Sequence, residues 1–239
     1  MNKALSRVSV FAALMVLALL VNVTVNYAWR SAGLLSDPGN RRVVDAQFDA
    51  PRGSILVGTT AVAETVPVEG GRFSVQRNYS DGPLYAPVTG HYSYIYGRTG
   101  LEQTYNDELS GTGDSQLFRR ILGELSGTPA QGATIQTTLD TNAQQAASNA
   151  LGGRTGAVVA MDYTTGAILT WASTPGYDPN ELSSTDLEST QAAWDRLNSD
   201  EGRPLEDRAT QEIYPPGSTF KLVVASAALE DGMGADSTV

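Results

Sequence analysis

The longest apolar pattern in the chain runs from Val8 to Val25 without a charged residue. Lys3 and Arg7 precede this run, and the aromatic residues Tyr27 and Trp29 follow it. A helix of this length crosses the roughly 30 Å apolar core of a bilayer, with aromatic side chains at the interface. Basic residues before such a run favour an N-terminus in the cytoplasm. The pattern therefore predicts one transmembrane helix, with the bulk of the chain outside the cytoplasm.

Two alternatives to a membrane anchor stay open for this run. A cleaved signal peptide has the same basic start, although Asn26-Tyr27-Ala28 is a poor cleavage site. A buried core helix is the second alternative, but such a helix rarely excludes charge so strictly. We expect a cytoplasmic tail at 1–7 and a membrane anchor at 8–29, which predicts a single-pass protein of the cell membrane.

Beyond the anchor, the pattern predicts short strands and helices. Residues 30–60 contain Pro-Gly and Pro-Arg-Gly breaks and are expected to form an extended stalk that enters a small domain. Residues 91–96 place three tyrosines at period two, which predicts a strand with one aromatic face and His91 at its edge. The apolar spacing of residues 114–125 predicts a helix that begins at Asp114.

The second half of the chain carries clearer local signals. Residues 134–139 alternate as a strand, and Asp140 or Thr141 then caps a helix that two glycines end. Residues 156–173 contain two apolar runs joined by a turn that ends at Gly166, which predicts a β-hairpin.

A candidate catalytic pair follows the breaker Pro215-Pro216-Gly217. Ser218 stands at the first turn of a mostly apolar predicted helix, and Lys221 lies one turn along on the same face. That spacing brings a hydroxyl nucleophile and an amine base within hydrogen-bond reach, as covalent catalysis by serine requires. The helix N-terminus would also stabilise an oxyanion at Ser218. The alternative is that the Ser-x-x-Lys pattern arises by chance and Ser218 only caps the helix.

The basic residues sharpen this hypothesis. Of sixteen, fourteen are arginines, and the only lysines are Lys3 and Lys221. Because a guanidinium does not deprotonate, Lys221 is the one cation beyond the anchor that can serve as a base. Its neighbours Phe220, Leu222 and Val223 are expected to desolvate the amine and lower its pKa.

Composition excludes several other classes of function. The chain has no cysteine, one histidine and a net charge of −10. It can therefore hold no disulfide framework, thiol nucleophile, thiolate zinc site or multi-histidine metal site. The acidic balance, concentrated in residues 181–212, argues against nucleic acid as the main partner. We predict neither a metal nor a cofactor.

Several segments share their pattern with one protein family. They are Pro51–Leu56, Tyr85–Gly90, Tyr96–Glu102, Tyr105-Asn106, Leu109–Gly111, Gly132–Asp140, Gly156–Asp162, Thr165-Gly166, Ser173–Asn180 and Tyr214–Lys221. Together they resemble the class B penicillin-binding proteins, and most closely the actinobacterial penicillin-binding protein A group. The resemblance covers nearly the whole chain.

The resemblance implies an α+β multidomain fold. After the transmembrane helix, it implies a small mixed α/β, non-catalytic (dimerisation or pedestal-like) domain at 30–155. Residues 156–239 would be the incomplete start of a penicillin-binding transpeptidase domain with the serine β-lactamase-like fold. The implied activity is that of a D,D-transpeptidase, which crosslinks peptidoglycan stem peptides in wall growth or cell division.

The same resemblance implies roles for the candidate pair. Ser218 would attack the D-Ala-D-Ala carbonyl and form an acyl-enzyme, and Lys221 would act as general base and proton shuttle. β-Lactams would acylate Ser218 as substrate mimics. The implied partners are stem peptides, β-lactams, the membrane and cell-wall synthesis or division proteins.

The chain departs from the family in one respect. The Ser-x-Asn and Lys-Thr-Gly motifs that follow the nucleophile helix in the family are not found after Ser218. We therefore expect a chain cut inside the catalytic domain, inactive by itself and poorly stable. Two alternative functions stay open: a non-catalytic module at 30–155 that binds division or elongation partners, and a β-lactam-sensing membrane protein.

Overall fold

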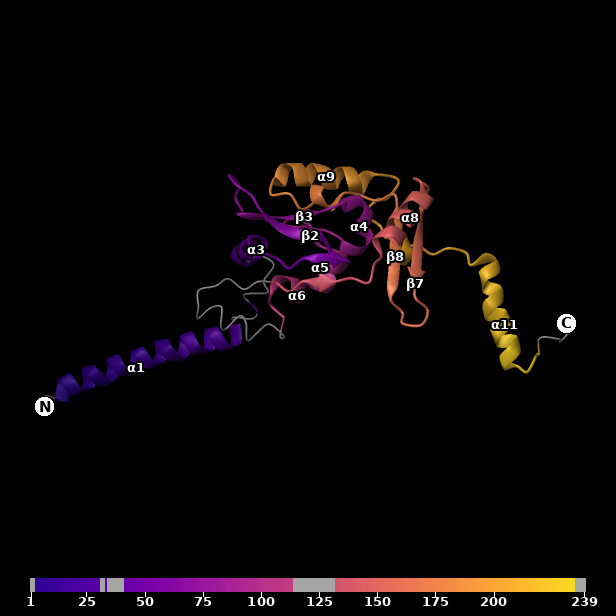
Figure 1. The fold of residues 1–239 in the computed structure, drawn as a ribbon. Helices are drawn as coiled ribbons and strands as arrows, with labels where there is room; N and C mark the ends of the chain where they lie inside the picture. The colour runs from indigo at the N-terminus through magenta and orange to yellow at the C-terminus, as the bar shows by residue number, and fades with distance from the viewer. Residues whose placement is uncertain (1–2, 31–32, 34–40, 114–131, 235–239) are drawn as a thin grey trace.

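The computed structural model describes residues 3–30, 33, 41–113 and 132–234. Figure 1 shows a central body of short strands and helices, with the helix α1 (Lys3–Val25) projecting from one side and α11 (Phe220–Glu230) from the other. α1 continues into a π-helical turn, η1 (Asn26–Arg30). The segment Ser6–Arg30 has a mean hydropathy of 2.5, is not buried against the body, and is long and apolar enough to cross a membrane.

A four-stranded mixed sheet forms the first part of the body, in the order β3-β2-β1-β6. Its strands are β1 (Ile55–Val57), β2 (Thr60–Pro67), β3 (Val75–Tyr79) and β6 (Ile135–Gln136). β2 pairs antiparallel with β1 and β3, whereas β6 pairs parallel with β1. The sheet is packed by α4 (Gly82–Thr89), α5 (Gly100–Thr104) and α6 (Asn106–Ser110) through a core that contains Ile55, Val57, Val62, Ala63, Tyr79, Tyr85, Leu109 and Leu139.

The predicted stalk at 30–60 is wrong where the structure describes it. Residues Arg41–Phe48 form the helix α3, and β1 follows. Phe48 is buried because its ring packs against Phe73 and Tyr92, with centroid separations of 4.8 and 5.2 Å. Contacts with residues from the following strands therefore hold this segment as a helix, and the local Pro-Gly breaks did not reveal them.

The strand predicted at 91–96 is also wrong. Only Tyr92–Ser93 (β4) and Gly97–Arg98 (β5) pair, and residues 94–96 form the turn between them. The tyrosines consequently do not share one face: Tyr92 stacks on Phe48, whereas Tyr96 stacks on Trp194 at 4.0 Å. His91 is buried, with 2% of its surface exposed, and does not lie at an open edge.

The local signals of the second half are largely confirmed. β6 is shorter than the strand predicted at 134–139, but Asp140 caps α8 (Thr141–Leu151) by accepting a 2.8 Å hydrogen bond from the Ala143 N–H. The helix ends at Gly152, whose φ of 55° a residue without Cβ adopts freely. The helix predicted at 114–125 lies outside the described residues.

The predicted hairpin is confirmed as β7 (Gly156–Met161) and β8 (Ile168–Thr174), paired antiparallel. Its turn closes through a 2.8 Å hydrogen bond from the Gly166 N–H to the Asp162 carbonyl. α8 covers one face of the hairpin. The buried Gln144 side chain joins the two elements, because it accepts from the Trp171 N–H and donates to the Trp171 carbonyl, each at 2.8 Å.

After β8 the chain returns to the first sheet. It forms η3 (Pro179–Glu181) and then α9 (Leu187–Ser199), which crosses above β2 and β3 in Figure 1. The Asn180 side chain accepts from the Tyr79 N–H at 2.8 Å and donates to the Tyr79 carbonyl at 2.9 Å. This arm therefore locks onto the edge of β3, and the chain then leads through α10 (Arg208–Gln211) toward Ser218.

Candidate functional site

The segment before Ser218 begins at a buried arginine. Arg208 is 2% exposed, and its guanidinium donates to the carbonyls of Gly202, Arg203 and Pro175. Its backbone N–H donates to the Ser173 Oγ at 3.1 Å, which attaches α10 to the end of β8. A guanidinium surrounded by carbonyl oxygens is well placed to fix this part of the backbone.

Glu212 connects this anchor to the next residues. Its Oε1 lies 2.7 Å from Arg203 and 3.4 Å from Arg208, and its Oε2 accepts a hydrogen bond from the Tyr214 hydroxyl. This hydrogen bond to a carboxylate raises the pKa of Tyr214. The side chain of Glu212 is 16% exposed, so its ion pairs are less screened than those on the open surface.

The predicted catalytic pair lies just beyond. Ser218 is in the 3₁₀ turn η4 (Gly217–Thr219), and Lys221 is in the first turn of α11, so both belong to one helical segment as predicted. Both side chains are exposed, and among the described residues neither takes part in a hydrogen bond or an ion pair. The structure thus places the pair on consecutive turns without joining it.

The desolvation expected around Lys221 is not present in this chain. Its neighbours Phe220, Leu222 and Val223 are 54%, 73% and 58% exposed. Figure 1 shows why: α11 stands clear of the body and packs on none of its described elements. Apolar neighbours in sequence desolvate an amine only where tertiary packing covers them, and here they face solvent.

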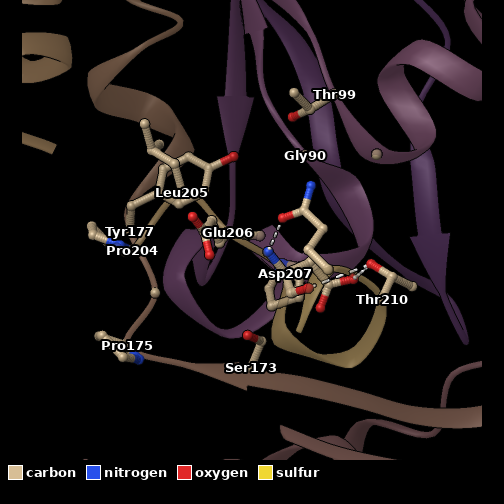
Figure 2. Close-up of a pocket in the computed structure, with 15 residues that line it drawn as sticks. Gly90, Thr99, Ser173, Pro175, Tyr177, Pro204, Leu205, Glu206, Asp207 and Thr210 are labelled. Carbon is tan, nitrogen blue, oxygen red and sulfur yellow. Dashed lines mark hydrogen bonds between the residues drawn. The ribbon is translucent and has the colours of Figure 1, made fainter. Parts of the chain in front are cut away.

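A pocket of about 220 Å³ lies behind this segment, between α4 and α5 on one side and the arm on the other. Figure 2 shows Asp207 and Thr210 in its lining, joined by a 2.9 Å hydrogen bond, with Gly90 and Thr99 from the first part of the body across from them. Neither this pocket nor an open groove of about 790 Å³ beside β6 is lined by Ser218 or Lys221. The candidate pair therefore lies outside both of these hollows.

A buried charge cluster in the first part of the body was not predicted from the sequence. Glu102 is fully buried, and its two carboxylate oxygens accept from the Nε of Arg52 at 3.0 Å and of Arg77 at 2.6 Å. Arg77 also donates to the Gly53 carbonyl, and Arg52 lies over the Tyr92 ring at 4.1 Å. Two of the segments that carry the family resemblance, 51–56 and 96–102, meet here, which was the available signal.

His91 also lies away from the candidate pair. Its Nδ1 is 2.9 Å from the Tyr177 hydroxyl and 3.2 Å from the Thr99 hydroxyl. Burial lowers the pKa of His91 to about 4 and raises that of Tyr177 to about 12, so both are neutral near pH 7. His91 therefore joins the first part of the body to the arm. Within the described ranges, no group of three or more acidic or histidine side chains could hold a metal ion.

Two protein families match the chain in succession. The family described as the penicillin binding protein A dimerisation domain matches residues 52–135. The penicillin binding protein transpeptidase domain family matches residues 156–239, which include Ser218 and Lys221.

Similar sequences are known by name. The peptidoglycan D,D-transpeptidase PbpA of Mycolicibacterium smegmatis is 40% identical over 237 residues, which cover 97% of this chain and 48% of that protein. The peptidoglycan D,D-transpeptidase MrdA of Escherichia coli K12 is 38% identical over 169 residues, 66% of this chain and 25% of that protein. The chain therefore spans about half the length of the mycobacterial relatives it matches.

Solved structures agree with these matches. The penicillin G acyl-enzyme complex of penicillin-binding protein A from Mycobacterium tuberculosis superposes with a TM-score of 0.74 at 38% identity, covering 79% of this chain and 44% of that one. PBP2 of Pseudomonas aeruginosa, in complex with WCK 5153, gives a TM-score of 0.62 at 30% identity, covering 77% and 41%.

Proposed function

The chain belongs to the penicillin-binding proteins of the penicillin-binding protein A type, and from this premise we propose that the whole protein is a peptidoglycan D,D-transpeptidase. Residues 30–155 would form its non-catalytic domain, and the transpeptidase domain would begin at 156. The observation that carries the proposal is the position of Ser218 and Lys221. They lie at the start of one helix, directly after the Pro-Pro-Gly turn, within the part that matches the transpeptidase family.

In the proposed reaction, the Ser218 Oγ forms an ester bond with the carbonyl carbon of the penultimate D-Ala. The bond to the terminal D-Ala breaks, and this D-Ala leaves as a free amino acid. Lys221 takes the hydroxyl proton and returns it to the leaving amine, after which an amine of a second stem peptide resolves the ester. The start of the helix favours the oxyanion formed on the way.

The location that suits this reaction is outside the cytoplasm. α1 is exposed along its apolar length, as a helix in lipid would be. We propose that it anchors the protein in the cell membrane by a single pass, with the body on the side where stem peptides are crosslinked. Cell-wall synthesis or division proteins are the proposed partners.

The 239 residues alone are proposed to be inactive. Ser218 is exposed, and none of the described side chains outside its own helical segment approaches it to bind a substrate carbonyl. The relatives carry about as much sequence again, so we propose that residues of the complete transpeptidase domain close the cleft over Ser218.

The test is covalent labelling of the whole protein with a fluorescent penicillin. Ser218→Ala should abolish the labelled band, because no ester can form without the hydroxyl. Ser226→Ala is the matched control, since Ser226 lies on the same helix and only donates to the Leu222 carbonyl. Labelling that survives in Ser218→Ala, or is lost equally in Ser226→Ala, contradicts the assignment.

A further inference from the structure

Tyr214 occupies an unusual position between the body and the candidate nucleophile. We propose that Tyr214 is a positioning residue for Ser218, acting through its hydrogen bond to Glu212, which sets the direction in which the backbone leaves the body. This inference rests on the proposed function, since it concerns the reactivity of Ser218.

The body side of this connection is rigid. Arg208 is held by three backbone carbonyls and by the Ser173 hydroxyl. Glu212 is tied to the same region because its Oε1 pairs with both Arg203 and Arg208. The carboxylate of Glu212 is therefore a fixed acceptor at the edge of the body.

The Tyr214 hydroxyl is the last contact with that fixed acceptor. Ile213, the residue before it, is 99% exposed and packs on none of the described residues that could guide the chain. Between residues 213 and 230, the other side-chain hydrogen bonds are local: Thr219 donates to the Pro216 carbonyl, and Ser226 donates to the Leu222 carbonyl. Without the Tyr214 bond, rotation about Ile213 would be unrestrained.

The residues between Tyr214 and Ser218 transmit this orientation. Pro215 and Pro216 have ring-restricted φ angles, and Pro216 has φ −66°. Tyr214 itself is restricted because a proline follows it. Gly217 then turns the chain with φ +53°, a conformation that residues with a side chain rarely adopt, and Ser218 follows directly. Few free rotations separate the phenol from the nucleophile, so an error in direction at Tyr214 reaches Ser218.

The predicted effect is on the chemical step. A hydroxyl nucleophile reacts efficiently only when it is held close to the attack geometry, and looser positioning lowers the acylation rate constant. Loss of the Tyr214 hydrogen bond should reduce the acylation rate constant about threefold to tenfold. The dissociation constant of the non-covalent β-lactam complex should stay unchanged, because Tyr214 is not proposed to touch the ligand.

The experiment uses the whole protein and stopped-flow fluorescence with a fluorescent penicillin, which separates the acylation rate constant from the dissociation constant. Tyr214→Phe removes only the hydroxyl. Tyr163→Phe is the matched control, because Tyr163 is 94% exposed at the tip of the β7–β8 turn, where its hydroxyl faces solvent. Wild-type acylation kinetics in Tyr214→Phe would overturn the inference.

A double-mutant cycle separates positioning from a general structural effect. Glu212→Gln weakens the acceptor, so Tyr214→Phe should add little in that background if both act through one bond. Full additivity of the two effects, or a matching fall in melting temperature, would overturn the inference. Failure of the wild-type protein to react, or labelling that persists in Ser218→Ala, would instead overturn the proposed function and this inference with it.

Discussion

Glu102→Gln tests whether the buried charge cluster holds the first part of the body together. The substitution keeps the shape of the side chain and removes its charge. Glu102 and the two arginines it binds have side chains between 0% and 3% exposed, so solvent does not screen them. Arg52 and Arg77 would remain buried without a counter-charge.

The expected loss of stability is large because no described group replaces the carboxylate. One Nη of Arg77 already lacks a hydrogen-bond partner among the described residues, so the cluster has no spare acceptor. Removing one member of a buried ion pair costs about 3–5 kcal/mol, and a single domain is typically stable by about 5–15 kcal/mol. We therefore expect Glu102→Gln to lower the free energy of unfolding by about 3 kcal/mol or more.

The assay is urea unfolding in detergent micelles, followed by tryptophan fluorescence. Trp194 stacks on Tyr96 and reports on the contact between the arm and the first part of the body. Glu69→Gln is the control, because Glu69 is exposed and is expected to change stability by no more than about 0.5 kcal/mol. A loss below about 1 kcal/mol in Glu102→Gln would refute the argument that Glu102 neutralises the two arginines.

Two further predictions concern local features. Because the folded state holds His91 neutral, with a pKa of about 4 against 6.5 when unfolded, its contribution to stability is complete above pH 6.5 and is lost as the pH falls toward 4, by up to about 3 kcal/mol. His91 is the only histidine, so its NMR titration gives the midpoint directly, and a value near 6.5 would contradict the burial argument. Asp140→Ala removes the cap of α8 and should cost about 1 kcal/mol in urea unfolding, whereas Asp140→Asn, which keeps an acceptor oxygen, should cost clearly less; equal losses would contradict the capping role.

Features that depend on neighbours in sequence were predictable. The hairpin around Gly166 and the Asp140 cap need only residues within a few positions of one another, because turns and helix ends are closed by local hydrogen bonds. The Ser218–Lys221 spacing was predictable for the same reason, since the helical repeat sets which residues share a face.

Predictions failed where distant residues override the local pattern. The Pro-Gly breaks around α3 favoured an extended stalk, but Phe48 packs onto Phe73 and Tyr92 and holds the segment as a helix. The alternation at 91–96 favoured a continuous strand, but Tyr96 is drawn to Trp194, about a hundred residues later, and a turn forms instead.

By itself, the sequence determined the apolar helix of membrane-spanning length, the β-hairpin and the pair Ser218 and Lys221 at the start of a helix. These features follow from hydropathy period and short-range hydrogen bonding, which a linear pattern records. Only the tertiary structure decided that Glu102 neutralises two distant arginines, and that Ser218 stands in solvent beyond a tether at Tyr214. Charge compensation and desolvation depend on which remote side chains pack together, and that information is not contained in any short stretch of the chain.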